Sequence, residues 1–118
     1  NKVEDFGVGF YTKYGDGGVD ISPIADLYKT EVWEMARELG IDPRIIDAKP
    51  TDGLWDDGRI DTDQLNGMSY PDLEWCMQNH DLPAVDMSEQ QIDNIELYNS
   101  IRNRNLHKMN PIPVFVKP

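Results

Sequence analysis

The chain has 118 residues, which is enough for one domain with a single hydrophobic core. Apolar residues make up 39% of it and charged residues 28%, a balance typical of folded globular proteins that excludes a compositionally disordered chain. The formal net charge of -11 excludes a general nucleic-acid binder, because such a surface repels phosphates and no basic patch overrides it.

The first third of the chain predicts a loop, an extended piece and a helix. Residues 7–18 are rich in glycine and are expected to form a loop. Residues 19–24 are expected to be a short extended piece, because Pro23 disfavours helical geometry in the residue before it. Apolar residues then recur at spacings of three and four over residues 27–39, which predicts an amphipathic helix with Gly40 as its left-handed C-cap.

The middle of the chain predicts one short helix and one long connection. Asp42 and Pro43 have the character of an N-cap and a first-turn proline, so a short helix is expected over residues 43–48. Residues 49–67 contain many aspartates and no helical periodicity. We interpret them as a long, solvated acidic loop.

Two capping boxes predict the remaining helices. Ser69 with Asp72, and Ser88 with Gln91, have the required spacing, and the helices are expected to run to about residues 79 and 105. Two prolines then hold the tail extended. The second helix has an apolar stripe that is expected to be buried: Ile92, Ile95, Tyr98 and Ile101.

The sequence also predicts the compartment. The single cysteine, Cys76, cannot form an internal disulfide and is expected to be a buried, inert thiol. No apolar run approaches the ~20 residues of a membrane span, and no signal-peptide pattern is present. We therefore expect a cytoplasmic protein without membrane contact. Because residue 1 is not methionine and leads straight into apolar sequence, the chain is expected to begin inside a longer polypeptide.

Several common site motifs do not fit. Gly7 and Gly9 start a dinucleotide fingerprint, but Thr12 occupies the position of its third glycine, and the P-loop pattern does not occur. No glycine has an aspartate at the spacing of an EF-hand loop. The residues that could bind zinc are too few and too scattered: Cys76, His80 and His107.

Charged residues placed around glycines are the pattern that remains. Glycines let a ligand approach the main chain, lysine offers a point charge to phosphate, and aspartate accepts from sugar hydroxyls or amides. The residues alone leave two interpretations open, a small-molecule site and a solvent-exposed turn. The charged residues in this pattern are Lys13, Asp16, Asp20 and Lys29.

Five segments, in this order and at these separations, resemble a known family. They are "GFYTKYGDGGVDISPI", "LYKTEV", "KPTDGLW", a D-x-x-Q-L-x-G-x-S-Y arrangement and "HKMNPIP". Together they are similar to the C-terminal half of NAD synthetases of the ammonia-using type, and the similarity covers essentially all 118 residues.

The resemblance implies a fold and an activity. It implies an α/β domain like that of adenine-nucleotide α-hydrolases, with a Rossmann-like parallel sheet, of which this piece would be mostly helices and loops. It implies a homodimer that activates the carboxylate of deamido-NAD with ATP and Mg²⁺. An adenylated intermediate and pyrophosphate form, and ammonia then displaces AMP to give NAD.

The resemblance also implies residue roles by matching positions. Lys29 and Thr51 would contact ATP. Glu4 would bind magnesium, with Asp5 as the alternative, because the loop has one residue more than the family spacing and a hard cation accepts either carboxylate. The deamido-NAD contacts would be Lys13, Asp20, His107 and Lys108.

One family motif is missing from these residues. The S-G-G-x-D-S pyrophosphate loop belongs to the N-terminal half of the domain, so residues 1–118 are expected to be the C-terminal portion of one synthetase domain, inactive alone. Ammonia is the expected nitrogen donor, and a glutamine-dependent form stays open. Two alternatives also remain: a non-catalytic dinucleotide-binding module, and a related ATP-pyrophosphatase that amidates another substrate.

Overall fold

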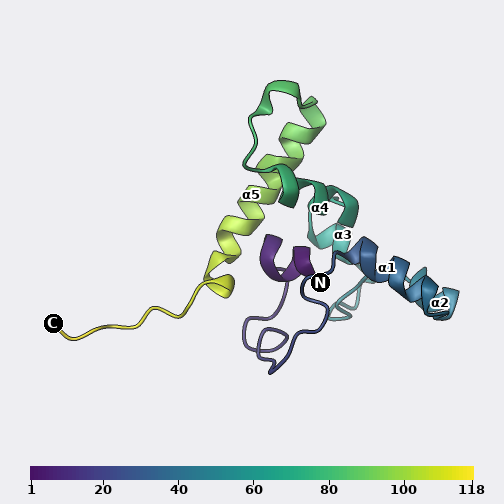
Figure 1. Ribbon diagram of the computed structural model, residues 1–118, viewed down its shortest axis with the longest axis horizontal. Coiled ribbons are helices and arrows are strands. Elements are labelled where there is room, and N and C mark those ends of the chain that lie inside the picture. Colours follow the sequence, from purple (N-terminus) through teal and green to yellow (C-terminus); the bar gives the residue numbers. More distant parts are fainter.

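The computed structural model describes residues 1–118, and their regular structure is entirely helical (Figure 1). A single π-helical segment, η1, begins the chain, a 3₁₀ turn, η2, precedes the last helix, and the C-terminal tail extends away from the body. No strand is formed, so the parallel sheet that the resemblance implies does not lie in these residues. The elements are η1 (Val3–Val8), α1 (Lys29–Glu38), α2 (Pro43–Ile46), α3 (Asp61–Gln64), α4 (Tyr70–Asn79), η2 (Ala84–Asp86) and α5 (Glu89–Met109).

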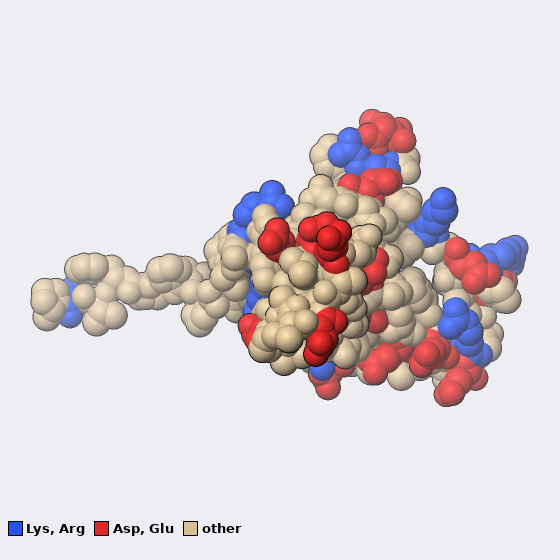
Figure 2. Space-filling view, turned by 90° about the horizontal axis from the view of Figure 1, so that it is seen from above, with Lys and Arg blue, Asp and Glu red and all other residues tan.

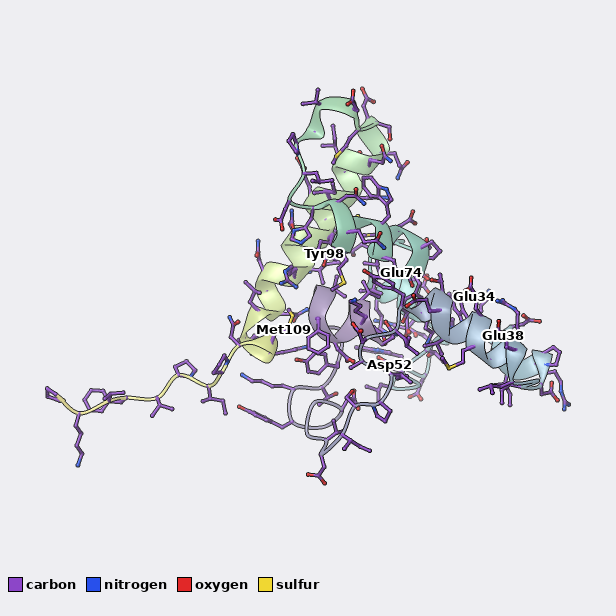
Figure 3. All side chains as sticks on the ribbon, viewed as in Figure 1. Glu34, Glu38, Asp52, Glu74, Tyr98 and Met109 are labelled. Atoms are coloured by element: carbon purple, nitrogen blue, oxygen red, sulfur yellow. The ribbon has the colours of Figure 1, made fainter.

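The hydrophobic core lies where η1, α4 and α5 meet. Tyr98 of α5 points into this junction, and Glu74 of α4 lies toward α1 (Figure 3), where it accepts hydrogen bonds from the Thr30 backbone N–H and hydroxyl at 3.1 and 2.7 Å. Cys76 is fully buried as expected, and burial raises the pKa of its thiol to about 11. The core side chains are Val3, Val8, Leu65, Met68, Tyr70, Leu73, Cys76, Tyr98 and Ile101.

Both predicted capping boxes are confirmed. The Ser69 hydroxyl accepts from the Asp72 N–H at 3.3 Å, and the Asp72 carboxylate accepts from the Ser69 N–H at 3.2 Å. Ser88 and Gln91 exchange the same bonds at 3.3 and 2.8 Å. The last helix continues to Met109, beyond the predicted end, because Pro111 first forces the residue before it into an extended conformation. Of its predicted stripe, Tyr98 and Ile101 are buried, whereas Ile92 and Ile95 are only partly buried.

The helices in the first half also match their predictions. Gly40, which follows the C-cap residue Leu39 of α1, has φ +69°, and the Asp42 carboxylate caps α2 by accepting from the Arg44 N–H at 2.9 Å. However, α1 buries none of its residues within this chain. Four apolar side chains of α1, α2 and the turn between them are exposed, and we call them the apolar strip: Met35, Leu39, Ile41 and Ile45. No helix is both long and apolar enough to cross a bilayer.

Three loop predictions were wrong in part. Residues 7 and 8 complete η1 instead of opening a loop, and residues 19–24 are not simply extended, since a turn occupies residues 23–26 where proline presets the backbone. The acidic loop contains α3. Asp63 supplies the local reason, because its carboxylate accepts from the Ile60 N–H at 3.0 Å and so caps the first turn.

Side chains of α5 bind the carbonyl groups that η1 leaves free at its end. The Arg102 guanidinium donates to the Phe6 and Gly7 carbonyls at 2.5 and 2.6 Å. The Asn105 amide donates to the Val8 carbonyl at 2.9 Å, and the Lys108 ammonium donates to the Gly9 carbonyl at 2.9 Å. We call this set of bonds the α5 clamp. It fixes where the glycine loop begins.

Gly9 provides a test of this packing. Its φ is +67°, and an added Cβ would lie 2.6 Å from the Asn105 Cβ, whereas at Gly53, also at φ +67°, nothing lies within 4 Å. Gly53→Ala should therefore cost only the left-handed conformation, roughly 1–2 kcal/mol. Gly9→Ala should lower the free energy of unfolding by a further 1–3 kcal/mol or so, because α5 must shift. Urea unfolding of both variants measures the difference, and equal losses would refute the close approach.

Candidate functional site

Two adjoining cavities open beside the glycine loop. The first, of about 370 Å³, we call the carboxylate cavity, and its walls are Asn1, Glu4, Asp5, Phe10, Tyr11, Asp16, Lys29, Pro50, Thr51, Asp52 and Asp61. The second, of about 540 Å³, we call the aromatic cavity, and its walls are Phe10, Tyr11, Thr12, Asp16, Asp52, Leu54, Trp55, Gln64 and Lys108. Phe10, Tyr11, Asp16 and Asp52 line both, so the two cavities are direct neighbours.

The carboxylate cavity brings together the residues predicted for ATP and metal. Glu4 and Asp5 come from η1, Lys29 is the first residue of α1, and Thr51 lies in the acidic loop. The Thr51 hydroxyl donates to the Arg59 carbonyl at 3.2 Å and accepts from the Gly53 N–H at 3.1 Å, which orders this part of the loop. Residues far apart in the chain therefore face one space.

Behind this cavity, one tyrosine joins two carboxylates. The Tyr70 hydroxyl lies 2.8 Å from Asp61 Oδ2 and contacts Glu4 Oε1 as well. Burial, and next its hydrogen bond to Glu4, hold the pKa of the Tyr70 hydroxyl far above its usual value. The Lys29 ammonium stands 5.2 Å from the centre of the Tyr70 ring.

Asp61 and Tyr70 are site residues that sequence reasoning did not single out. They are the two ends of the D-x-x-Q-L-x-G-x-S-Y arrangement, so the signal was present in the sequence. The place of these two residues in the site depends on the contact between Tyr70 and Glu4, and Glu4 lies outside this segment of the sequence.

The donors present suit a hard divalent cation shared with a bound phosphate. No three His, Cys, Asp or Glu side chains are grouped closely enough to hold a metal ion by themselves. Magnesium usually takes one or two carboxylates together with substrate phosphates and water. Glu4 and Asp5 supply such carboxylates at the cavity wall, and Asp61 beside them has a buried oxygen, Oδ1, without a partner.

The predicted dinucleotide residues are only partly brought together. Lys13 Nζ lies 3.3 Å from His107 Nδ1, which places the glycine loop against the end of α5. Lys108 lies next to them and lines the aromatic cavity. Its ammonium donates to the Tyr11 carbonyl at 2.7 Å as well as to Gly9, and burial lowers its pKa. Asp20 is exposed and lines none of the cavities.

The charge around the site is strongly acidic. Figure 2 shows acidic side chains spread over the body of the molecule, while the extended tail carries little charge. Within the carboxylate cavity, Lys29 is the one lysine or arginine side chain among five carboxylates. An anionic phosphate can bind there only if a lysine or a cation offsets this field.

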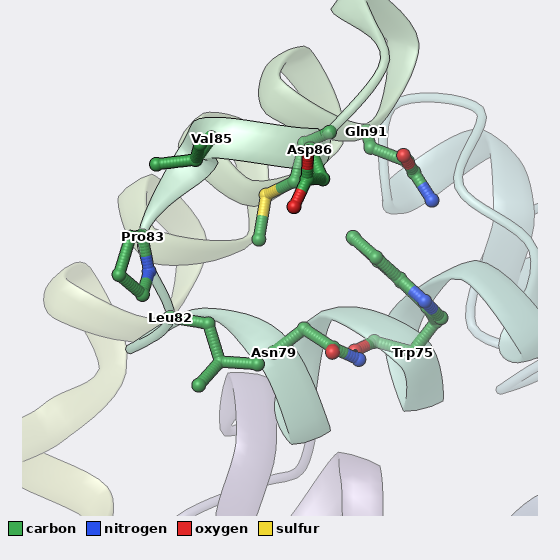
Figure 4. Close-up of a pocket in the computed structure, with 8 residues that line it drawn as sticks. Trp75, Asn79, Leu82, Pro83, Val85, Asp86 and Gln91 are labelled. Atoms are coloured by element: carbon green, nitrogen blue, oxygen red, sulfur yellow. The ribbon is translucent and has the colours of Figure 1, made fainter.

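A separate hollow lies away from these residues. It has a volume of about 440 Å³ and is formed by α4, η2 and α5, with Trp75 and Gln91 on one side and Leu82, Pro83 and Val85 on the other (Figure 4). None of the predicted site residues lines it.

Five carboxylates and one lysine thus line one cavity beside a loop that side chains of α5 hold. Comparison with known families identifies the chain more closely: the model of the NAD synthase family matches residues 1–111. The chain therefore belongs to the NAD synthase family.

Several curated proteins named NH(3)-dependent NAD(+) synthetase are similar to this chain. The Thermococcus kodakarensis protein is 40% identical over 110 residues, which cover 88% of this chain and 42% of that protein. For Methanosarcina acetivorans the identity is 40% over 121 residues, or 96% of this chain and 46% of the relative. The Archaeoglobus fulgidus protein is 54% identical over 67 residues, which cover 57% of this chain and 26% of that protein. The chain thus spans less than half the length of these relatives.

Proposed function

We propose that this chain is the C-terminal portion of an enzyme domain that converts deamido-NAD to NAD with ATP and ammonia. Family membership supports the proposal, and one observation carries it: the ATP and metal residues implied by the resemblance line one cavity. Because a carboxylate is a poor electrophile, its oxygen must become part of a leaving group before ammonia attacks. Adenylation achieves this and releases pyrophosphate.

In this proposal the carboxylate cavity holds the phosphates of ATP. Lys29 faces them with its positive charge and Thr51 with its hydroxyl. Glu4, with Asp5 as the alternative, would hold Mg²⁺, which offsets the charge that develops on the phosphates. The aromatic cavity and the glycine loop would hold deamido-NAD, with Lys13, His107 and Lys108 near its anionic parts and Asp20 entering from the loop.

We also propose the surroundings of this piece. A parallel sheet of the same domain would cover the exposed apolar strip on α1 and α2, since Met35, Leu39, Ile41 and Ile45 have no cover within this chain. The pyrophosphate loop would come from that part too, which leaves the 118 residues inactive alone. A homodimer and a cytoplasmic location, where ATP is available, complete the proposal.

Isotope exchange tests the proposed activity. The complete encoded polypeptide should exchange labelled pyrophosphate into ATP only when deamido-NAD is present, and it should release NAD and AMP when ammonia is added. Glutamine in place of ammonia tests the glutamine-dependent form. Binding of deamido-NAD without exchange would favour the non-catalytic module, and exchange driven by another carboxylate would favour the related amidating enzyme.

Lys13 tests the proposed dinucleotide contacts. Lys13→Ala in the complete polypeptide should raise the KM for deamido-NAD roughly 10-fold, the effect of one charge-assisted hydrogen bond, while the KM for ATP changes little. Asp20→Ala should act in the same direction. Steady-state kinetics with each substrate varied in turn provide the measurement, and equal losses for both substrates would argue against the assignment.

A further inference from the structure

Asp61, the first residue of α3, is a buried carboxylate whose contacts are incomplete. It is only 6% exposed, Oδ2 lies 2.8 Å from the Tyr70 hydroxyl, and Oδ1 has no partner. A carboxylate buried in this way costs folding free energy unless it is fully hydrogen-bonded. Its position at the wall of the carboxylate cavity suggests that the cost is retained for function.

Tyr70 connects Asp61 to Glu4. Its hydroxyl contacts Glu4 Oε1 and Asp61 Oδ2, but a hydroxyl has a single proton and donates to only one acceptor at a time. The three groups come from η1, α3 and α4. The backbone bond from the Asp61 N–H to the Pro50 carbonyl, at 3.0 Å, ties α3 to the loop that bears Thr51, so Asp61 is held in place.

We propose that Asp61 is a positioning residue for the cation carboxylate Glu4 and that it acts through Tyr70. The inference rests on the proposed function, in which Glu4 binds the divalent cation. When Glu4 gives its oxygens to the cation, Tyr70 turns its proton to Asp61 and stays hydrogen-bonded in the core. Without Asp61, cation binding would leave the buried Tyr70 hydroxyl unpaired, and the affinity for the cation would fall.

The test is a double-mutant cycle on cation affinity. Mn²⁺ binding to the complete polypeptide is measured by electron paramagnetic resonance of the free ion, with α,β-methylene-ATP present, because this analogue cannot transfer its adenylyl group to a substrate. The variants are Asp61→Leu, which removes the acceptor, Asp61→Asn, which retains one, Tyr70→Phe, and Asp61→Leu with Tyr70→Phe. Asp56→Asn, an exposed carboxylate of the same loop, is the control.

We expect Asp61→Leu to raise the Mn²⁺ dissociation constant roughly 10-fold, the size usual for groups that orient a metal ligand. Asp61→Asn and the control should stay near the parent, and Asp61→Leu should have no effect once Tyr70 is phenylalanine. An unchanged constant in Asp61→Leu, or the same loss with and without the Tyr70 hydroxyl, would overturn the inference.

A further variant separates this inference from the proposed function. If Glu4→Gln leaves Mn²⁺ binding unchanged, the cation does not use Glu4 and the positioning role of Asp61 is refuted. Pyrophosphate exchange by the unaltered polypeptide decides the proposed activity independently of that result.

Discussion

Replacing Lys29 with methionine should lower kcat/KM for ATP in the adenylation step by roughly 10²–10³-fold, the usual loss when one preorganised positive group is removed from a site of developing charge. Lys29 is the lone lysine or arginine of the carboxylate cavity, where it faces five carboxylates. Without it, the negatively charged phosphates of ATP would be repelled by the negative potential of the carboxylates. Pyrophosphate exchange at varied ATP concentration measures the loss.

Lys49→Met is the matched control for Lys29. Lys49 is exposed, lies two residues before Thr51 and lines no cavity, so its replacement removes the same charge close to the site without altering the wall. Its effect should stay within about twofold, as is usual for surface substitutions. Similar losses in both variants would mean that the general charge of the region matters and that Lys29 has no direct role.

Lys108→Met should have the second large effect, because it should lower both the stability of the fold and the apparent affinity for deamido-NAD. The Lys108 ammonium donates to the Gly9 and Tyr11 carbonyls, and the Tyr11 hydroxyl donates back to the Lys108 carbonyl at 2.8 Å. Losing two bonds from a charged donor should lower the free energy of unfolding by about 2–3 kcal/mol. The released loop should raise the KM for deamido-NAD by about 10-fold or more.

Arg104 supplies the comparison on the same helix. It is exposed and its side chain makes no hydrogen bond or ion pair, so Arg104→Met removes an equal charge without touching the loop. We expect little change in chemical denaturation or in KM. If Lys108→Met altered KM but left the unfolding midpoint unchanged, the lysine would act on the ligand alone, and the α5 clamp would not need it.

Local signals predicted the longer helices because their information lies within a few residues. Ser69 and Ser88 mark the starts of α4 and α5 as N-cap residues, and Gly40 marks the end of α1. The short elements lack such signals. The four residues of α3 are too few to show helical periodicity, so the sequence did not predict this helix. The end of η1 was predicted as loop because it contains glycine, and the Arg102 side chain that binds its last carbonyl groups is distant in the sequence.

The site was predictable in part, for the same physical reason. Resemblance pointed to Glu4, Lys29 and Thr51, and the structure places them around one cavity, although their roles stay predictions. The link from Glu4 through Tyr70 to Asp61 could not be derived, because it joins residues from separate elements and depends on how those elements pack.

The α5 clamp also determines when the site can form during folding. Its bonds join residues 96 apart, from Arg102 to Phe6, and 99 apart, from Lys108 to Gly9. Helices such as α5 can form early from contacts close in sequence, but these bonds require the two ends of the chain to meet, with the full entropy of closing that loop. Competence to hold a ligand should therefore arise late, after most of the helix content is already present.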